Sequence, residues 1–156
     1  MSERMRKDVT DMLVLFTALP ATLLKGLNIE TEKKINLTEK KTLLFIFQHE
    51  GMPMNFYSRM ANLESGSFTY TAKGLEKKGL IKRVESFDDH RKTGLVLTER
   101  GRATAAMMYG KMEAHVYRLL DVLTEEELRR FYSAIRVLYD TKSKVEAGLQ
   151  ADSFRH

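Results

Sequence analysis

The sequence predicts a mainly α-helical protein that contains one small β-hairpin. Apolar residues recur at three- and four-residue steps toward both ends of the chain, as they do in amphipathic helices. Between these ends, two short helical patterns precede two short runs that are rich in aliphatic and β-branched residues. The chain has 156 residues, of which 43% are hydrophobic and 30% are charged, and this composition is typical of a globular domain.

The first helix is expected over residues 4–27, with a kink or restart at Pro20 because proline lacks a backbone donor. Its buried side is expected to hold Met5, Val9, Met12, Leu13, Phe16 and Leu19. A second helix is expected to open at residues 37–38, with Thr38 as its N-cap. Gly51 and Pro53 mark the end of that helix, since proline cannot continue it.

Two short helices are expected next, over residues 55–62 and 66–78, the latter with Ser65 as a candidate cap. Lys77 lies in the last turn, where cations are favoured, and Gly79 lies just past the end. Two short helices joined by a tight turn are typical of a helix-turn-helix. Strands are expected over residues 80–84 and 94–97. The loop between them is longer than most hairpin loops, which fits either a DNA-contacting wing or a tolerated surface insertion.

Two helices are expected in the C-terminal part of the chain. Thr98 caps the first, which runs to about residue 121, and a capping box of Thr124 and Glu127 opens the second. Residues 149–156 are expected to form a disordered tail. We predict that residues 1–36 and 102–148 form a dimerisation region, although packing within one chain is the alternative. The expected interface residues are Val9, Leu13, Phe16, Leu128, Phe131, Ile135 and Leu138.

The composition argues against several classes of protein. The absence of cysteine excludes disulfides, zinc–thiolate sites and thiol-based redox sensing. The four histidines form no local pair at ligand spacing, so we expect no metal site. The chain has no apolar run of membrane-spanning length and no signal-peptide pattern, so we expect a cytoplasmic location. It also lacks a Gly-rich phosphate loop and a nucleophile motif, so we expect neither an enzyme nor a cofactor.

Positive charge is concentrated in one segment. The net charge is +5, and residues 71–102 hold nine Lys or Arg and five Asp or Glu, a net +4. Helical spacing over residues 66–78 places Phe68, Ala72 and Leu75 on one side. The opposite side carries Gly66, Tyr70, Lys73 and Lys77, with Ser67 and Thr69 on the flanks. Such a helix fits the DNA major groove, although an ordinary solvated face is the alternative.

The loop over residues 85–93 carries Arg91 and Lys92 near its tip. Arginine suits a narrow minor groove, where the negative potential is enhanced. Asp88 and Asp89 would repel phosphate, so we expect one of them to pair with Arg91 and hold its guanidinium in place.

Several motifs in this order resemble the MarR family of regulators. They are Leu37-Thr38, Ser67-Phe68-Thr69-Tyr70, Leu75-Glu76-Lys77-Lys78-Gly79-Leu80-Ile81, Asp89-His90-Arg91 and Leu97-Thr98-Glu99-Arg100-Gly101. The resemblance implies that Ser67, Thr69 and Tyr70 begin the recognition helix. It also implies that Arg91 is the wing-tip arginine with Asp89 as its positioning partner. One departure is Tyr70, which stands where the family often has arginine, and Thr71 and Gly74 also differ from the usual residues.

The resemblance further implies that the terminal helices form the dimer interface and that a small apolar or phenolic effector binds between them and the DNA-binding lobe. That region would be lined by Met12, Phe16, Met108 and Met112, although ordinary core packing is the alternative. The prediction is therefore a winged helix-turn-helix over residues 37–101, flanked by dimerisation helices. It would act as a ligand-responsive transcriptional regulator that binds a pseudo-palindromic duplex as a homodimer. The alternative is a winged-helix module that binds proteins.

Overall fold

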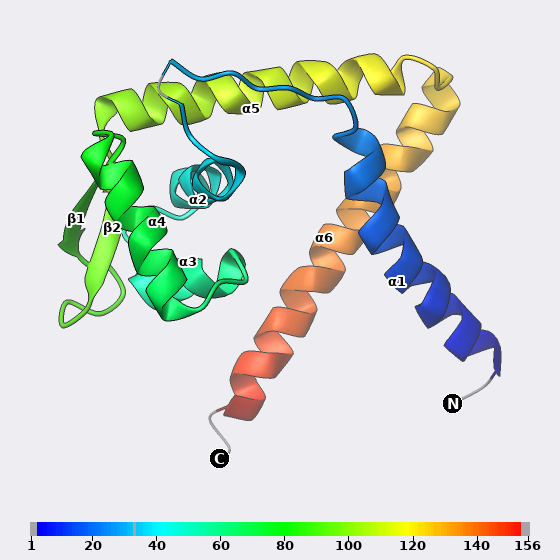
Figure 1. Cartoon of the computed structure of the whole chain (residues 1–156). Helices are drawn as coiled ribbons and strands as arrows, with labels where there is room; N and C mark the ends of the chain where they lie inside the picture. The colour runs from blue at the N-terminus through cyan, green and yellow to red at the C-terminus, as the bar shows by residue number, and fades with distance from the viewer. Residues whose placement is uncertain (1–2, 33, 154–156) are drawn as a thin grey trace. The chain divides into compact units, whose positions relative to one another are not determined.

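The computed structural model describes residues 3–32 and 34–153 and confirms the predicted fold class. Its elements, in chain order, are α1 (Glu3–Leu23), α2 (Leu37–Gln48), α3 (Met54–Met60), α4 (Ser65–Lys77), β1 (Ile81–Glu85), β2 (Thr93–Leu97), α5 (Glu99–Leu120) and α6 (Glu125–Ser153) (Figure 1). The chain divides after His115 into two compact units. No helix in the described ranges is long and apolar enough to cross a membrane.

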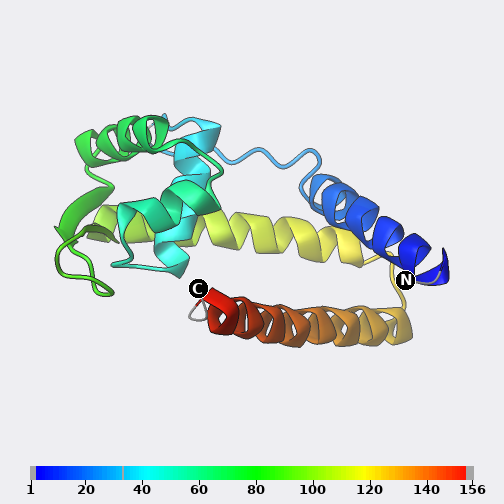
Figure 2. The same cartoon turned by 90° about the horizontal axis from the view of Figure 1, so that it is seen from below.

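The core of the first unit lies between α2, α3, α4 and the hairpin, which gather together in Figure 2. It is made of apolar side chains from each of these elements and from the start of α5, among them Leu43, Ile46, Tyr57, Phe68, Leu75, Leu95 and Ala105. The rings of Tyr57 and Phe68 stack with their centroids 6.3 Å apart, which joins α3 to α4. The apolar face of α4 is therefore fixed against the core, and its other face is turned outward.

Tyr57 is fully buried and places a polar hydroxyl group inside this core. Its hydroxyl donates to the carbonyl of His49, accepts from the amide of Met52 at 3.2 Å and lies 3.3 Å from the carbonyl oxygen of Leu95. One side chain thus connects the end of α2, the following turn and β2. Burial raises the pKa of Tyr57 to about 12, because the phenolate would lose its hydration.

We expect Tyr57→Phe to lower the free energy of unfolding by about 1–2 kcal/mol, because a buried amide and buried carbonyls lose their partner. Urea denaturation followed by circular dichroism measures this change. Tyr70→Phe is the matched control, since Tyr70 is 80% exposed. The raised pKa also predicts that the contribution of Tyr57 to stability is constant below about pH 10 and declines as the pH rises toward 12, and that Tyr57→Phe removes this part of the decline. Equal stability of the two variants would contradict the role given to the hydroxyl.

The predicted hairpin is present, although β1 lies one residue later than expected and β2 begins one residue earlier. β1 and β2 pair antiparallel, from Ile81 opposite Leu97 to Glu85 opposite Thr93. The loop between them covers residues 86–92, two residues fewer than expected, because Glu85 and Thr93 still pair. Gly94 of β2 also bridges to Pro53, which holds the hairpin against the start of α3.

The helix caps differ in part from the predicted ones. The N-cap of α2 is Asn36 and not Thr38, because the Asn36 side chain accepts from the Glu39 amide at 2.9 Å and Glu39 accepts from the Asn36 amide at 2.8 Å. The N-cap of α4 is Glu64 and not Ser65, and its side chain makes no capping hydrogen bond. The capping box of Thr124 with Glu127 is present as predicted.

The two terminal helices also have different lengths from those predicted. α1 continues through Pro20 and ends at Leu23, four residues before the expected end. α6 continues to Ser153, so residues 149–153 of the expected disordered tail are helical. Residues 154–156 lie outside the described residues.

Both terminal helices carry apolar side chains that the single chain leaves exposed. On α1, Val9, Leu13 and Phe16 are exposed. On α6, Ile135 and Leu138 are exposed, whereas Leu128 and Phe131 are half-buried. Apolar surface of this extent on a helix is typical of an interaction site.

Candidate nucleic-acid interface

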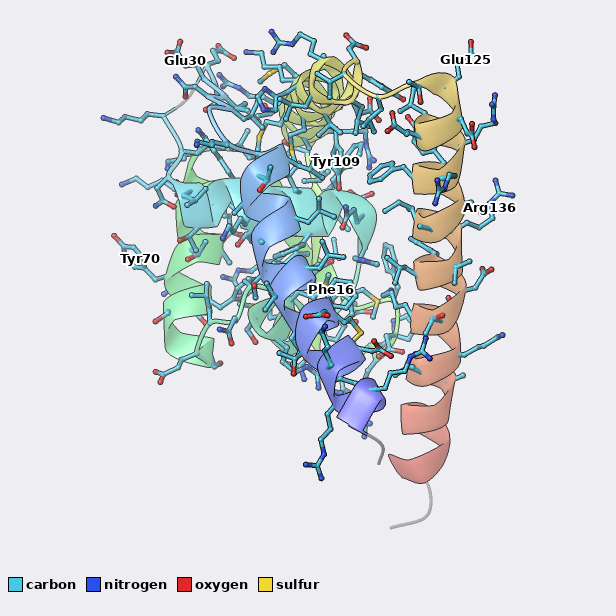
Figure 3. The ribbon with its side chains drawn as sticks, turned by 90° about the vertical axis from the view of Figure 1, so that its right-hand side faces the viewer. Phe16, Glu30, Tyr70, Tyr109, Glu125 and Arg136 are labelled. Atoms are coloured by element: carbon cyan, nitrogen blue, oxygen red, sulfur yellow. The ribbon has the colours of Figure 1, made fainter. Side chains whose placement is uncertain are left out.

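The outer face of α4 is open to solvent along its length. Phe68, Ala72 and Leu75 are buried, so helical geometry turns Lys73 and Lys77 outward. Tyr70 is 80% exposed and extends away from the helix (Figure 3). The other predicted contact residues on α4 are Ser67, Lys73 and Lys77, which are exposed, and Thr69, which is half-buried. The structure therefore brings the hydroxyls of Ser67 and Tyr70 and the cations of the outer face onto one surface, whereas the Thr69 hydroxyl donates to the carbonyl of Ser65 at 2.8 Å.

The start of α4 is polar and uncovered. The N-cap residue, Glu64, makes no side-chain capping hydrogen bond, and a Cβ atom on Gly66 would have open space around it within 4 Å. An uncapped helix N-terminus carries a partial positive charge and free amide donors, which favour an anion such as phosphate.

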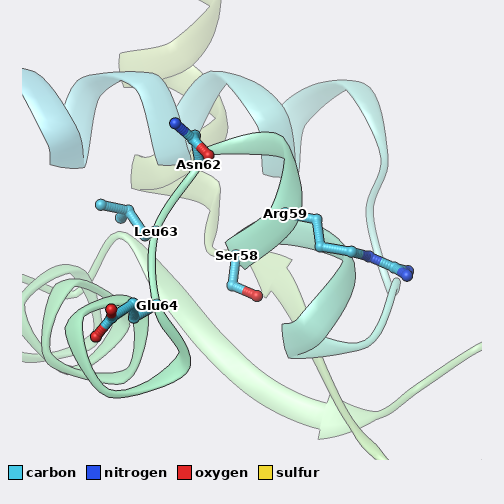
Figure 4. A pocket seen from close by; sticks show the side chains of 5 residues that line it. All are labelled: Ser58, Arg59, Asn62, Leu63 and Glu64. Atoms are coloured by element: carbon cyan, nitrogen blue, oxygen red, sulfur yellow. The ribbon is translucent and has the colours of Figure 1, made fainter.

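An open hollow of about 350 Å³ lies at the turn between α3 and α4 (Figure 4). It is lined by Ser58, Arg59, Asn62, Leu63 and Glu64. Arg59 is exposed, and Asn62 takes a positive φ of 52°, a conformation that asparagine tolerates better than most residues. Neither residue was predicted from the sequence as part of a site. The available signal was an asparagine in a turn, three positions after an arginine.

The hairpin loop holds one arginine in a defined position. Asp89 accepts hydrogen bonds from the amide and the Nε of Arg91, both at 3.1 Å, and its other oxygen lies 3.0 Å from the Nζ of Lys92. The Asp89 carboxylate also accepts from one terminal nitrogen of Arg91 at 3.5 Å. The Arg91 side chain is 91% exposed, so its guanidinium is anchored on one edge and presented to solvent. Asp88 has a different environment, since its amide lies 3.3 Å from the Ser86 hydroxyl. Of the two aspartates, Asp89 is the one that contacts Arg91.

Charge pairing in this loop lowers the pKa of Asp89 to about 2. The largest cause is the hydrogen bond from the Arg91 side chain, followed by that from Lys92. The carboxylate of Asp89 is therefore ionised over the whole neutral range.

The hairpin is also attached to α4. Arg83 of β1 donates from its Nε to Glu76 of α4 at 3.2 Å. The hairpin lies beside α4 in Figure 1, so the two elements that carry the predicted contact residues belong to one lobe.

Comparisons with known proteins place the chain in a family. The family model described as "MarR family" matches residues 35–93, from the loop before α2 to the start of β2. The organic hydroperoxide resistance transcriptional regulator of Bacillus subtilis (strain 168) is 30% identical over 112 residues, which is 69% of this chain and 74% of that protein. This chain belongs to the MarR family.

Further relatives agree with this assignment. The HTH-type transcriptional regulator MhqR of the same strain is 31% identical over 94 residues, which is 60% of this chain. The chain spans about 65% of the length of MhqR and of a second regulator, YfiV.

Two solved structures share the fold. A MarR family protein from Bacillus stearothermophilus matches with a TM-score of 0.66 at 18% identity, over 92% of this chain and 99% of that one. FabT of Streptococcus pneumoniae, in a structure with DNA, matches with a TM-score of 0.59 at 24% identity, over 92% of this chain and 98% of that one.

The first unit of this MarR-family chain also contains an apolar hollow of about 270 Å³. Met108 and Met112 of α5 line it, together with Leu44 of α2 and the loop after α1. Met12 and Phe16, which were expected beside these methionines, are absent from its lining and are exposed on α1. Lys40 and Lys41 also line the hollow, and the Nζ of Lys40 donates to the carbonyl of Ile29 at 2.5 Å.

Proposed function

We propose that this protein is a transcriptional regulator of the MarR family that binds a pseudo-palindromic DNA duplex as a homodimer. The observation that carries the proposal is the exposed cationic face of α4 in the same lobe as the Asp89-anchored, exposed Arg91. No step of this function requires catalysis or a cofactor.

The proposed docking places α4 in the major groove. Ser67, Thr69 and Tyr70 lie near the N-terminus of the helix and would reach base edges or nearby phosphates. Lys73 and Lys77 would neutralise phosphates. Arg91 would enter the adjacent minor groove, with Lys92 close to its phosphates. Tyr70 offers one hydroxyl where a bidentate arginine is frequent, so its base preference differs from that of arginine.

The proposed dimer uses the terminal helices, in residues 1–36 and 102–148. Val9, Leu13 and Phe16 of α1 and Ile135 and Leu138 of α6 are exposed in the single chain, and a second copy would cover them. Leu128 and Phe131 would add to the apolar surface of α6. A two-fold dimer binds two half-sites about 34 Å, or one helical turn, apart.

Selection of bound duplexes from a random pool tests this function and requires no known operator. We expect an enriched motif with two-fold symmetry and half-site centres about 10 base pairs apart. Analytical ultracentrifugation of the protein alone is expected to give a dimer. Retention of no duplex at low salt would refute the DNA-binding function and favour a protein-binding module.

We expect Lys77→Ala to weaken binding by a similar factor on the selected duplex and on random DNA. The reason is that a phosphate contact is independent of sequence, so its loss reduces the slope of log Kd against log salt by about one. Fluorescence anisotropy at several salt concentrations measures both quantities. Lys111→Ala, an exposed lysine of α5, is the control for the loss of one positive charge. Equal slopes for the two variants would place Lys77 outside the interface.

We also propose that the hollow lined by Met108 and Met112 receives a small, largely apolar effector. Its lining is apolar apart from Asn28, Lys40 and Lys41, which would favour an effector with an anionic or phenolic end. Binding would shift DNA occupancy only if the effector prefers one of two conformations. A thermal-shift screen of aromatic carboxylates and phenols, repeated with Met108→Trp to fill the hollow, tests this. Stabilisation that survives Met108→Trp would place the ligand elsewhere.

A further inference from the structure

Glu39 of α2 is the only charged side chain that is fully buried among the described residues, at 4% exposure. Burial of a carboxylate is costly unless cations and hydrogen-bond donors surround it. The presence of a charge at this position therefore calls for a role that an apolar residue could not fill.

The contacts of Glu39 connect two elements. Its two carboxylate oxygens each lie 2.6 Å from the Nζ of Lys78, the C-cap residue of α4. One of these oxygens also accepts from the amide of Asn36, the N-cap of α2, at 2.8 Å. A single carboxylate thus ties the start of α2 to the end of the helix that carries Tyr70, Lys73 and Lys77.

The backbone of α4 approaches the same carboxylate closely. A Cβ atom on Gly74 would lie 2.7 Å from the Oε1 of Glu39. The carboxylate is already held by Lys78 and Asn36, so it has little freedom to move aside. Glycine at this position allows the helix to lie directly against Glu39.

We propose that Glu39 is a positioning residue for DNA recognition, which acts through Lys78 to set where the outer face of α4 lies. This inference rests on the proposed function. Hydrogen bonds to base edges tolerate errors of only a few tenths of an ångström, whereas attraction to phosphates falls off slowly with distance. Loss of the Glu39–Lys78 pair therefore reduces discrimination between DNA sequences more than it reduces general affinity.

The main test compares Glu39→Gln with Glu125→Gln. Both replacements remove one carboxylate, and Glu125 pairs with Arg129 on the exposed surface of α6. The probes are the duplex selected by the unmodified protein and a random duplex of equal length, at a temperature where circular dichroism shows every variant folded. We define the binding ratio as the dissociation constant for the random duplex divided by that for the selected duplex. For Glu39→Gln we expect this binding ratio to fall by about ten-fold or more, with an unchanged slope of log Kd against log salt. Glu125→Gln is expected to leave the ratio unchanged.

Lys78 variants separate positioning from direct DNA contact. Lys78→Met is expected to reduce the binding ratio as Glu39→Gln does. The double variant is expected to show no larger reduction of this ratio than either single variant. Lys78→Arg keeps the charge and is expected to retain most of the ratio, so the comparison still decides the matter if Glu39→Gln fails to fold. Additive losses, or a lower salt slope in Lys78→Met, would overturn the proposal, because Lys78 would then act on phosphate.

Hydrogen exchange of the free protein tests the positioning without DNA. Glu39→Gln is expected to accelerate exchange of the amides in the last turn of α4, and Glu125→Gln is not. If the unmodified protein selects no duplex, the proposed function fails while this measurement still decides whether Glu39 fixes α4. Unchanged exchange together with an unchanged binding ratio would refute the inference.

Discussion

Gly101→Ala is expected to destabilise the lobe by roughly 3 kcal/mol or more, because a Cβ atom there overlaps fixed backbone. That atom would lie 1.8 Å from the carbonyl oxygen of Leu80 and 2.8 Å from its carbonyl carbon. The backbone of Leu80 has little room to retreat, since its carbonyl accepts from the Thr98 amide at 3.1 Å. The Thr98 hydroxyl also accepts from Gly101 and donates to the carbonyl of Gly79 at 2.7 Å. The start of α5 is thus packed directly against the turn that ends α4.

The same helix provides a control substitution for which the opposite change in stability is expected. Gly110 also lies in α5, where a Cβ atom would meet no other atom within 4 Å. Gly110→Ala is therefore expected to stabilise the protein by up to about 1 kcal/mol through helix propensity. Urea denaturation of both variants measures the difference. A shift of the same sign in both would show that propensity, and not the contact with Leu80, governs position 101.

Arg91→Ala is expected to weaken binding to the selected duplex by about 10- to 100-fold, the range for loss of one well-placed arginine contact in a groove. The loss is expected to be largest for duplexes whose flanking minor grooves are narrow and A·T-rich. Arg129→Ala removes the same side chain from the surface of α6 and is the control. Anisotropy titrations with A·T- and G·C-flanked duplexes measure the effect. Equal affinities of the two variants for both duplexes would contradict a role of the loop in binding.

The contact between Arg91 and Asp89 can also be measured in the free protein, through the pKa of Asp89. The pKa of Asp89, about 2 in the unmodified chain, is expected to rise toward its ordinary value of 3.8 in Arg91→Ala. Because the native pKa is the lower one, the pairing is fully present above about pH 4 and is lost as the pH falls toward 2. Carboxyl NMR titration measures this shift. Asp89→Asn is expected to weaken DNA binding less than Arg91→Ala, since the guanidinium remains but loses its anchor.

The kinds of elements and their order could be predicted from the sequence alone. The spacing of Phe68, Ala72 and Leu75 identified the buried side of α4, and hence its outer face, because the period of a helix is a local property. The hairpin was identified from two short runs rich in β-branched and aliphatic residues on either side of a polar loop, which is also a local property.

The tertiary structure decided what depends on residues far apart in the chain. Glu39 and Lys78 are 39 positions apart, and the local capping pattern of Asn36 and Glu39 does not show that this carboxylate is buried against Lys78. The apolar hollow holds Met108 and Met112 without Met12 and Phe16, because periodicity shows that a face is apolar but not which element covers it. Gly101 likewise appeared only as part of a motif, and its contact with the Leu80 carbonyl supplies the reason for glycine. Local patterns follow from backbone geometry and can be recognised in a short stretch of sequence. Partners across the fold are decided by close packing between distant segments, which no short stretch of sequence reveals.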